Sequence, residues 1–80
     1  MNLDEVEVGR TSLVKKIMPP KGRSDLGGQL EDIGFLPGEC VTVLKKGLFK
    51  GGPFLVRIGA STFALRQSEA QMIEVDSLMS

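Results

Sequence analysis

In the second half of the chain, large apolar residues recur at every second position, which is the period of a β-strand with one buried face. The pattern covers residues 40–45, 54–58 and 63–66, and its inward-facing candidates are Val41, Val43, Phe54, Val56, Ile58, Phe63 and Leu65. Glycine-containing segments at 46–53 and 59–62 separate the three runs and predict hairpin connections. We therefore expect three successive antiparallel strands.

The first half predicts a longer and less regular strand over residues 6–18. Two adjacent apolar pairs, at 13–14 and 17–18, break the alternation, which indicates a β-bulge or a bend. The prolines at 19–20 lack the amide hydrogen that a ladder needs, so the strand is expected to end before them.

A short helix is expected next, beginning at Ser24 as the N-cap and ending at Gly34. The apolar face of this helix is predicted to carry Leu26, Leu30 and Ile33. Gly34 suits the left-handed C′ position of a Schellman motif, in which Phe35 would contact Leu30.

The remaining segments complete an all-β arrangement. Residues 36–39 (Leu-Pro-Gly-Glu) predict a type II turn, 67–71 have room for one helical or 3₁₀ turn, and Ile73 and Val75 predict a closing strand before a flexible tail at 76–80. We interpret residues 1–80 as one domain: a mainly β, small SH3-like barrel of about five strands with one short α-helix and a 3₁₀ turn. Closure into a barrel would remove exposed sheet edges.

Several short motifs follow one another in a consistent order and spacing. They are Gly9 with Val14 and Ile17, the decapeptide at 29–38 (QLEDIGFLPG), Val41-Thr42-Val43-Leu44, Gly52-Pro53-Phe54, Ala64-Leu65-Arg66, Glu69-Ala70 and Ile73-Glu74-Val75. Together they resemble the FeoA family, the small cytosolic components of bacterial ferrous-iron transport, over nearly the whole chain. The loop exit differs, because residues 51–53 are Gly-Gly-Pro where the family commonly has Gly-Asp-Pro.

The resemblance implies a cytoplasmic, non-catalytic accessory protein. Its partner would be a FeoB-type ferrous iron transporter, a membrane protein with a cytosolic GTPase domain, whose transport or GTPase activity it would modulate. A cytoplasmic location also agrees with a single cysteine and with the absence of any apolar run near the ~20 residues of a membrane span.

The residue types offer little for catalysis. The chain has no histidine, which excludes Ser-His and Cys-His nucleophiles, and the carboxylates show no shared site. Metal candidates are weak: Glu39 and Cys40 could supply half of an iron or zinc site shared by two copies, whereas a buried, inert Cys40 is the favoured alternative. A metal-sensing domain therefore stays open as a second hypothesis.

Docking is the function that the residues favour. Leu48 and Phe49 lie in a glycine-rich loop, and Leu44 and Leu55, on the opposite strand faces from the valines and Phe54, would extend an apolar partner-binding patch. Simple capping of the barrel's open end is the alternative for Leu48 and Phe49. Nucleic-acid binding is a weaker hypothesis, since ten basic residues balance ten acidic ones and the four phenylalanines have no Tyr or Trp beside them. Direct membrane insertion is not expected.

Overall fold

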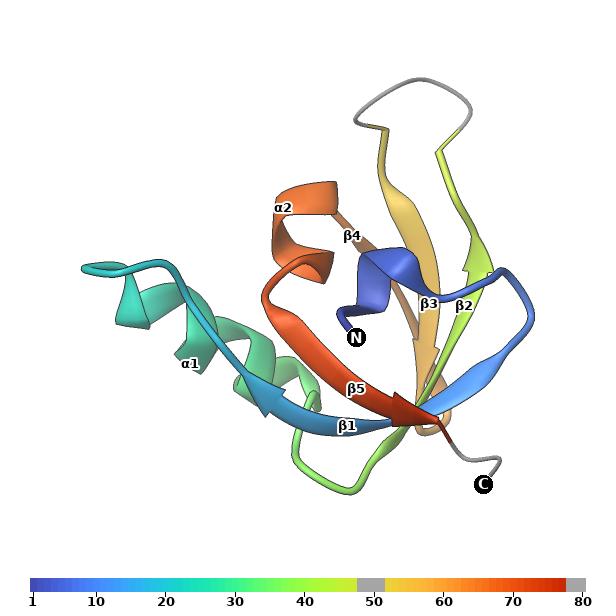
Figure 1. Cartoon of the computed structure of the whole chain (residues 1–80), viewed down its shortest axis with the longest axis horizontal. Coiled ribbons are helices and arrows are strands. Elements are labelled where there is room, and N and C mark those ends of the chain that lie inside the picture. The colour runs from blue at the N-terminus through green and yellow to red at the C-terminus, as the bar shows by residue number, and fades with distance from the viewer. Residues whose placement is uncertain (48–51, 78–80) are drawn as a thin grey trace.

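The computed structural model describes residues 1–47 and 52–77 (Figure 1). The elements in chain order are the 3₁₀ turn η1 (Leu3–Glu5), β1 (Thr11–Ile17), α1 (Ser24–Ile33), β2 (Cys40–Lys45), β3 (Phe54–Ile58), β4 (Ser61–Leu65), α2 (Gln67–Ala70) and β5 (Ile73–Ser77). β2 and β3 match their predicted bounds, whereas β4 begins at Ser61, inside the segment predicted as a turn. β5 continues through Ser77, two residues beyond Val75.

The strands form one antiparallel sheet in the order β4-β3-β2-β1-β5, which curls into an SH3-like barrel with α1 at its side (Figure 1). β4 and β5 lie at the two ends of this order, so no β4–β5 ladder closes the sheet. The predicted barrel is therefore present, but the expectation that its closure removes exposed edges is wrong within the described residues.

The core follows the period-two pattern. The predicted inward residues Val41, Val43, Phe54, Val56, Ile58 and Leu65 are all buried. Phe63 is only half-buried, because it lies on the terminal strand β4, beside which the described residues form no further strand. Leu3 and Val6, which the sequence did not assign to the core, are buried through the η1 turn.

β1 begins at Thr11 rather than at residue 6. A turn precedes it, in which Gly9 has φ of 88° and the Arg10 amide donates to the Glu7 carbonyl oxygen at 3.1 Å. The predicted irregularity is present as a register shift against β5 between Val14 and Lys16.

The end of α1 agrees with the Schellman prediction. The Phe35 amide donates to the Leu30 carbonyl at 3.1 Å, and the Gly34 amide donates to the Glu31 carbonyl at 3.0 Å. The start differs, since Arg23 occupies the N-cap position and Ser24 is the first helical residue, without a side-chain capping bond. A turn over residues 36–39 follows, with Gly38 at φ of 91°.

Candidate docking site

An apolar groove of about 300 Å³ lies where β2 ends and β3 begins. We call it the strand-end groove; it is lined by Lys45, Lys46, Gly47, Pro53, Phe54, Leu55 and Ala64. Carbon atoms dominate its lining, and Lys45 and Lys46 are the charged residues among those that line it. Such a surface can hold an apolar side chain of a partner while the rim contacts polar or acidic groups.

Strand geometry explains which residues line this groove. Leu55 alternates with the core residues of β3 and is 38% exposed, and the antiparallel register places Ala64 of β4 directly opposite it. On the other side of β3, the register with β2 shifts between Val43 and Lys45, so that Lys45 faces Leu55. The shift leaves Leu44 as the extra residue of β2.

Of the four predicted partner-binding residues, the structure describes Leu44 and Leu55. Leu55 lines the strand-end groove, but Leu44 is half-buried and does not line it. Leu48 and Phe49 lie outside the described residues. Ala64 was not selected from the sequence, although its alternation with Phe63 and Leu65 was a usable signal for an outward-facing position.

Lys46 connects the groove to the N-terminal turn. Its Nζ donates to the Asp4 carbonyl oxygen at 3.1 Å and lies 5.6 Å from the centroid of the Phe54 ring. The ammonium group thus contacts a neutral oxygen and an aromatic face rather than a carboxylate, and it keeps its positive charge available to a ligand.

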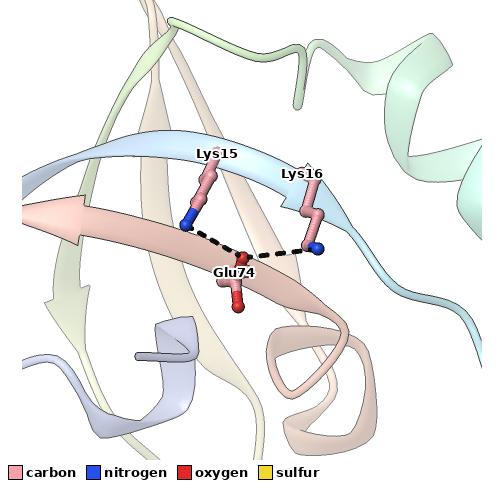
Figure 2. A network of polar contacts seen from close by, with 3 residues as sticks. All are labelled: Lys15, Lys16 and Glu74. Carbon is pink, nitrogen blue, oxygen red and sulfur yellow. Dashed lines mark ion pairs between the residues drawn. The ribbon is translucent and has the colours of Figure 1, made fainter.

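A second pair of lysines is arranged differently (Figure 2). Lys15 and Lys16 reach Oε2 of Glu74 with their Nζ atoms at 3.8 and 3.9 Å. Adjacent residues of a regular strand point to opposite faces, but the bulge in β1 lets both side chains reach the same carboxylate on β5. This part of the surface is therefore partly neutralised.

The weak metal candidates lie at the start of β2. Cys40 is exposed, which corrects the expectation of a buried thiol; it stands on the strand face opposite to the core residue Val41. Glu39 is exposed beside it. Across residues 1–47 and 52–77, no three side chains among His, Cys, Asp and Glu gather into a cluster that could hold a metal ion, and structural zinc sites take four ligands.

A larger groove of about 390 Å³ separates α1 from the end of β1. Gly27 allows the close approach here, because a Cβ on it would stand 3.3 Å from the Pro19 ring. Lys16 and Glu31 both line this groove, so its charges are mixed. These mixed charges favour no single class of ligand, whereas the charged residues that line the strand-end groove are all basic.

The described part of the chain has no helix with the length and apolar character needed to cross a membrane. The fold and the groove define a small SH3-like barrel with an exposed apolar groove and no recognisable catalytic cluster among the described residues. The family model for the FeoA domain matches residues 1–77, and the chain belongs to this family.

Solved structures agree with the family assignment. FeoA from Stenotrophomonas maltophilia, solved in complex with zinc, is 34% identical, with a TM-score of 0.85 over 95% of this chain and 89% of the other. It is described as a prokaryotic SH3 domain protein with a suggested role as a ferrous iron transport activating factor. A FeoA-like protein from Clostridium acetobutylicum is 28% identical, with a TM-score of 0.82 over 100% of this chain and 88% of the other.

The same fold also occurs within a larger regulator. A manganese-dependent transcriptional repressor is 27% identical, with a TM-score of 0.83 over 98% of this chain, but this chain spans only 41% of the repressor. No curated protein sequence matches the chain. Membership of the FeoA family links the chain to ferrous iron transport.

Proposed function

We propose that this chain is a non-catalytic, cytoplasmic accessory protein of ferrous iron uptake. It docks through the strand-end groove on the cytosolic part of a FeoB-type transporter and modulates its transport or GTPase activity. The observation that carries this proposal is the exposed apolar groove around Leu55, bordered by Lys45 and Lys46, on a member of the FeoA family. Grouped apolar side chains on a soluble domain are typical of docking surfaces.

Binding is tested by calorimetric titration of the protein with the isolated cytosolic GTPase domain of the transporter. Leu55→Ser removes apolar contact from the groove, and we expect affinity to fall about tenfold or more, which corresponds to about 1.4 kcal/mol. The rate of GTP hydrolysis, measured with and without the protein, reports on modulation.

Leu36→Ser is the matched control. Leu36 is 45% exposed and Leu55 38%, but Leu36 lies in the turn after α1 and does not line the groove. Equal losses of affinity in both variants would contradict the groove as the docking site, and no binding by the wild-type protein would reject the GTPase domain as partner. Replacing Leu48 and Phe49 together by Ser tests whether these two residues, which the sequence predicts to bind the partner, contribute.

Metal sensing is the second candidate, because the Cys40 thiol is exposed beside Glu39 and a relative binds zinc. A shared site in a dimer would bind iron or zinc weakly and at a fixed stoichiometry, and Cys40→Ala would abolish that binding. Iron or zinc binding that is unchanged in Cys40→Ala rejects this site.

A further inference from the structure

Among the described residues, the edge of the sheet at β4 lacks charged residues, proline and a second pairing strand. Its five residues, Ser61–Leu65, include no charged residue and no proline, and β4 pairs only with β3 among the described strands. The opposite edge differs: β5 carries Glu74 and Asp76, and the Val75 amide donates to the Met1 carbonyl at 2.8 Å. Natural sheets usually blunt or cover an exposed edge, so the bare edge of β4 is a candidate for strand addition.

The hairpin geometry identifies the backbone groups available at this edge. Ile58 and Ser61 flank a two-residue loop in which Gly59 has φ of 58°, as in a type II′ turn. The residues that flank such a loop form a hydrogen-bonded pair, and hydrogen-bonded pairs alternate along an antiparallel ladder. The amides of Ser61 and Phe63 therefore face β3, while the amide and carbonyl groups of Thr62 and Ala64 face outward.

Charge is distributed unevenly along the chain. Residues 40–68 contain five basic residues and no acidic one, while the rest of the chain holds all ten acidic residues. Four of the five basic residues, Lys45, Lys46, Arg57 and Arg66, lie in the described part, and none of them forms an ion pair there. In contrast, Lys15 and Lys16 approach Glu74.

Two of these cationic residues, Lys45 and Arg57, belong to the outer face of the sheet. Arg57 is exposed on β3 opposite Thr62, and Leu55 is opposite Ala64, which also lines the strand-end groove. A strand added to β4 would thus run alongside the groove, with alternate side chains beside this positive face. Its remaining side chains would point to the inner face, next to the half-buried Phe63.

We propose that the edge of β4 binds an extended segment of a partner protein in which acidic and apolar residues alternate. The acidic side chains lie toward Arg57 and Lys45, the apolar ones cover Phe63, and the segment's backbone pairs with Thr62 and Ala64. The inference rests on the proposed docking function and specifies how the partner is recognised.

Charge argues against the other occupants of this edge. Two copies joined along β4 would bring Arg57 and Arg66 of each copy into the same interface, where like charges repel. Single-stranded nucleic acid stacks on exposed aromatic rings, but of the phenylalanines that the structure describes, Phe35 and Phe54 are buried and Phe63 is half-buried. A protein segment with alternating acidic and apolar residues has the opposite charge to the basic residues and a backbone that can pair with β4.

The test is residue-resolved amide exchange by NMR with the peptide acetyl-Glu-Val-Glu-Leu-Glu-Val-Glu-amide. At saturation we expect the amide hydrogens of Thr62 and Ala64 to exchange at least about tenfold more slowly than in the free protein. Those of Ser61 and Phe63, which are already bonded to β3, should change little. The same peptide with Lys in place of Glu should not bind, and added salt should weaken the acidic peptide.

Ala64→Pro removes one outward amide at a position where an edge strand tolerates proline, and it should abolish peptide binding. Ala64→Ser keeps the amide, so it should lose far less peptide binding than Ala64→Pro does. The amide spectrum of β1 and β5 reports whether each variant is folded, and the exchange experiment on the wild-type protein decides the question even if Ala64→Pro does not fold.

Several results would overturn strand addition at β4. Peptide binding without slower exchange at Thr62 and Ala64, or equal binding of the lysine peptide, would reject the edge or its charge preference. The same protection on raising the protein concentration alone would indicate self-association. Tighter binding of single-stranded DNA at this edge would indicate nucleic acid as the ligand. If the GTPase domain binds without protecting these two amides, docking stands and strand addition is rejected. If the peptide protects them but the GTPase domain does not bind, the edge is correct and the proposed partner is wrong.

Discussion

Gly28 lies within α1 and Gly34 directly follows it, and the two differ in backbone conformation. Gly34 has φ of 130°, which a residue with a Cβ rarely adopts, whereas Gly28 is an exposed helical position where an added Cβ would meet no atom within 4 Å. Gly34→Ala should therefore lower the free energy of unfolding by about 1–3 kcal/mol. Gly28→Ala should raise it by about 0.5–1 kcal/mol, because alanine loses less backbone entropy in a helix.

Urea denaturation followed by circular dichroism measures both changes. The same glycine-to-alanine substitution is thus expected to change the free energy of unfolding in opposite directions at the two positions. Each variant is therefore the control for the other. Loss of stability in both variants would show that Gly28 is needed for the groove between α1 and β1, which it also lines.

Single residues were predictable where local backbone chemistry fixes them. Gly34 and Phe35 form the expected Schellman motif because the carbonyl of Leu30 needs a donor at the helix end. Ser24 and Cys40 were assigned wrongly for a common reason: neither a capping hydroxyl nor strand burial follows from residue type alone. Cys40 lies outward because the core side of β2 is taken by the valines.

At the scale of the element, α1 presents a narrower buried face than its sequence predicts. Leu30 is 1% exposed, Leu26 is half-buried and Ile33 is 37% exposed. Leu30→Ala should therefore cost about 2–5 kcal/mol of unfolding free energy, a large fraction of the total for a domain of this size. Ile33→Ala should cost less than about 1 kcal/mol.

Chemical denaturation with fluorescence of a bound dye or with circular dichroism compares the two variants. A similar cost for Ile33→Ala would mean that the helix turns its whole apolar stripe toward the barrel, as the sequence predicted.

The strands were predictable because alternation and burial share one period, and β3 reproduces it without exception. Register was not predictable. The shift between Val43 and Lys45 separates Leu44 from the groove and places Lys45 in it, and nothing in the local sequence fixes the position of that shift. The η1 turn was missed because Leu3 and Val6 are buried by contacts distant in sequence, not by a local pattern.

At the scale of the molecule, the number of strands and their order along the chain followed from the sequence, but which strands form the two edges of the sheet did not. Strand pairing at β5 is supplemented by the N-terminal residues Met1 and Asn2, whereas β4 has no such cover among the described residues. The formal net charge of zero likewise conceals an uneven distribution, since the acid-free region 40–68 forms the three strands at one end of the sheet.

This distribution predicts that the protein binds a sulfonate cation exchanger at pH 7 and low salt, although its formal net charge is zero. Attraction depends on the local field of unpaired cations within about 10 Å at 0.1 M salt, not on the total charge. Arg57→Gln and Lys15→Gln each remove one positive charge, but Arg57 has no ion pair among the described residues, while Lys15 lies 3.8 Å from Glu74. Arg57→Gln should therefore elute at clearly lower salt than Lys15→Gln in a linear gradient. Equal shifts would mean that only net charge matters and would remove the electrostatic basis for an acidic partner at β4.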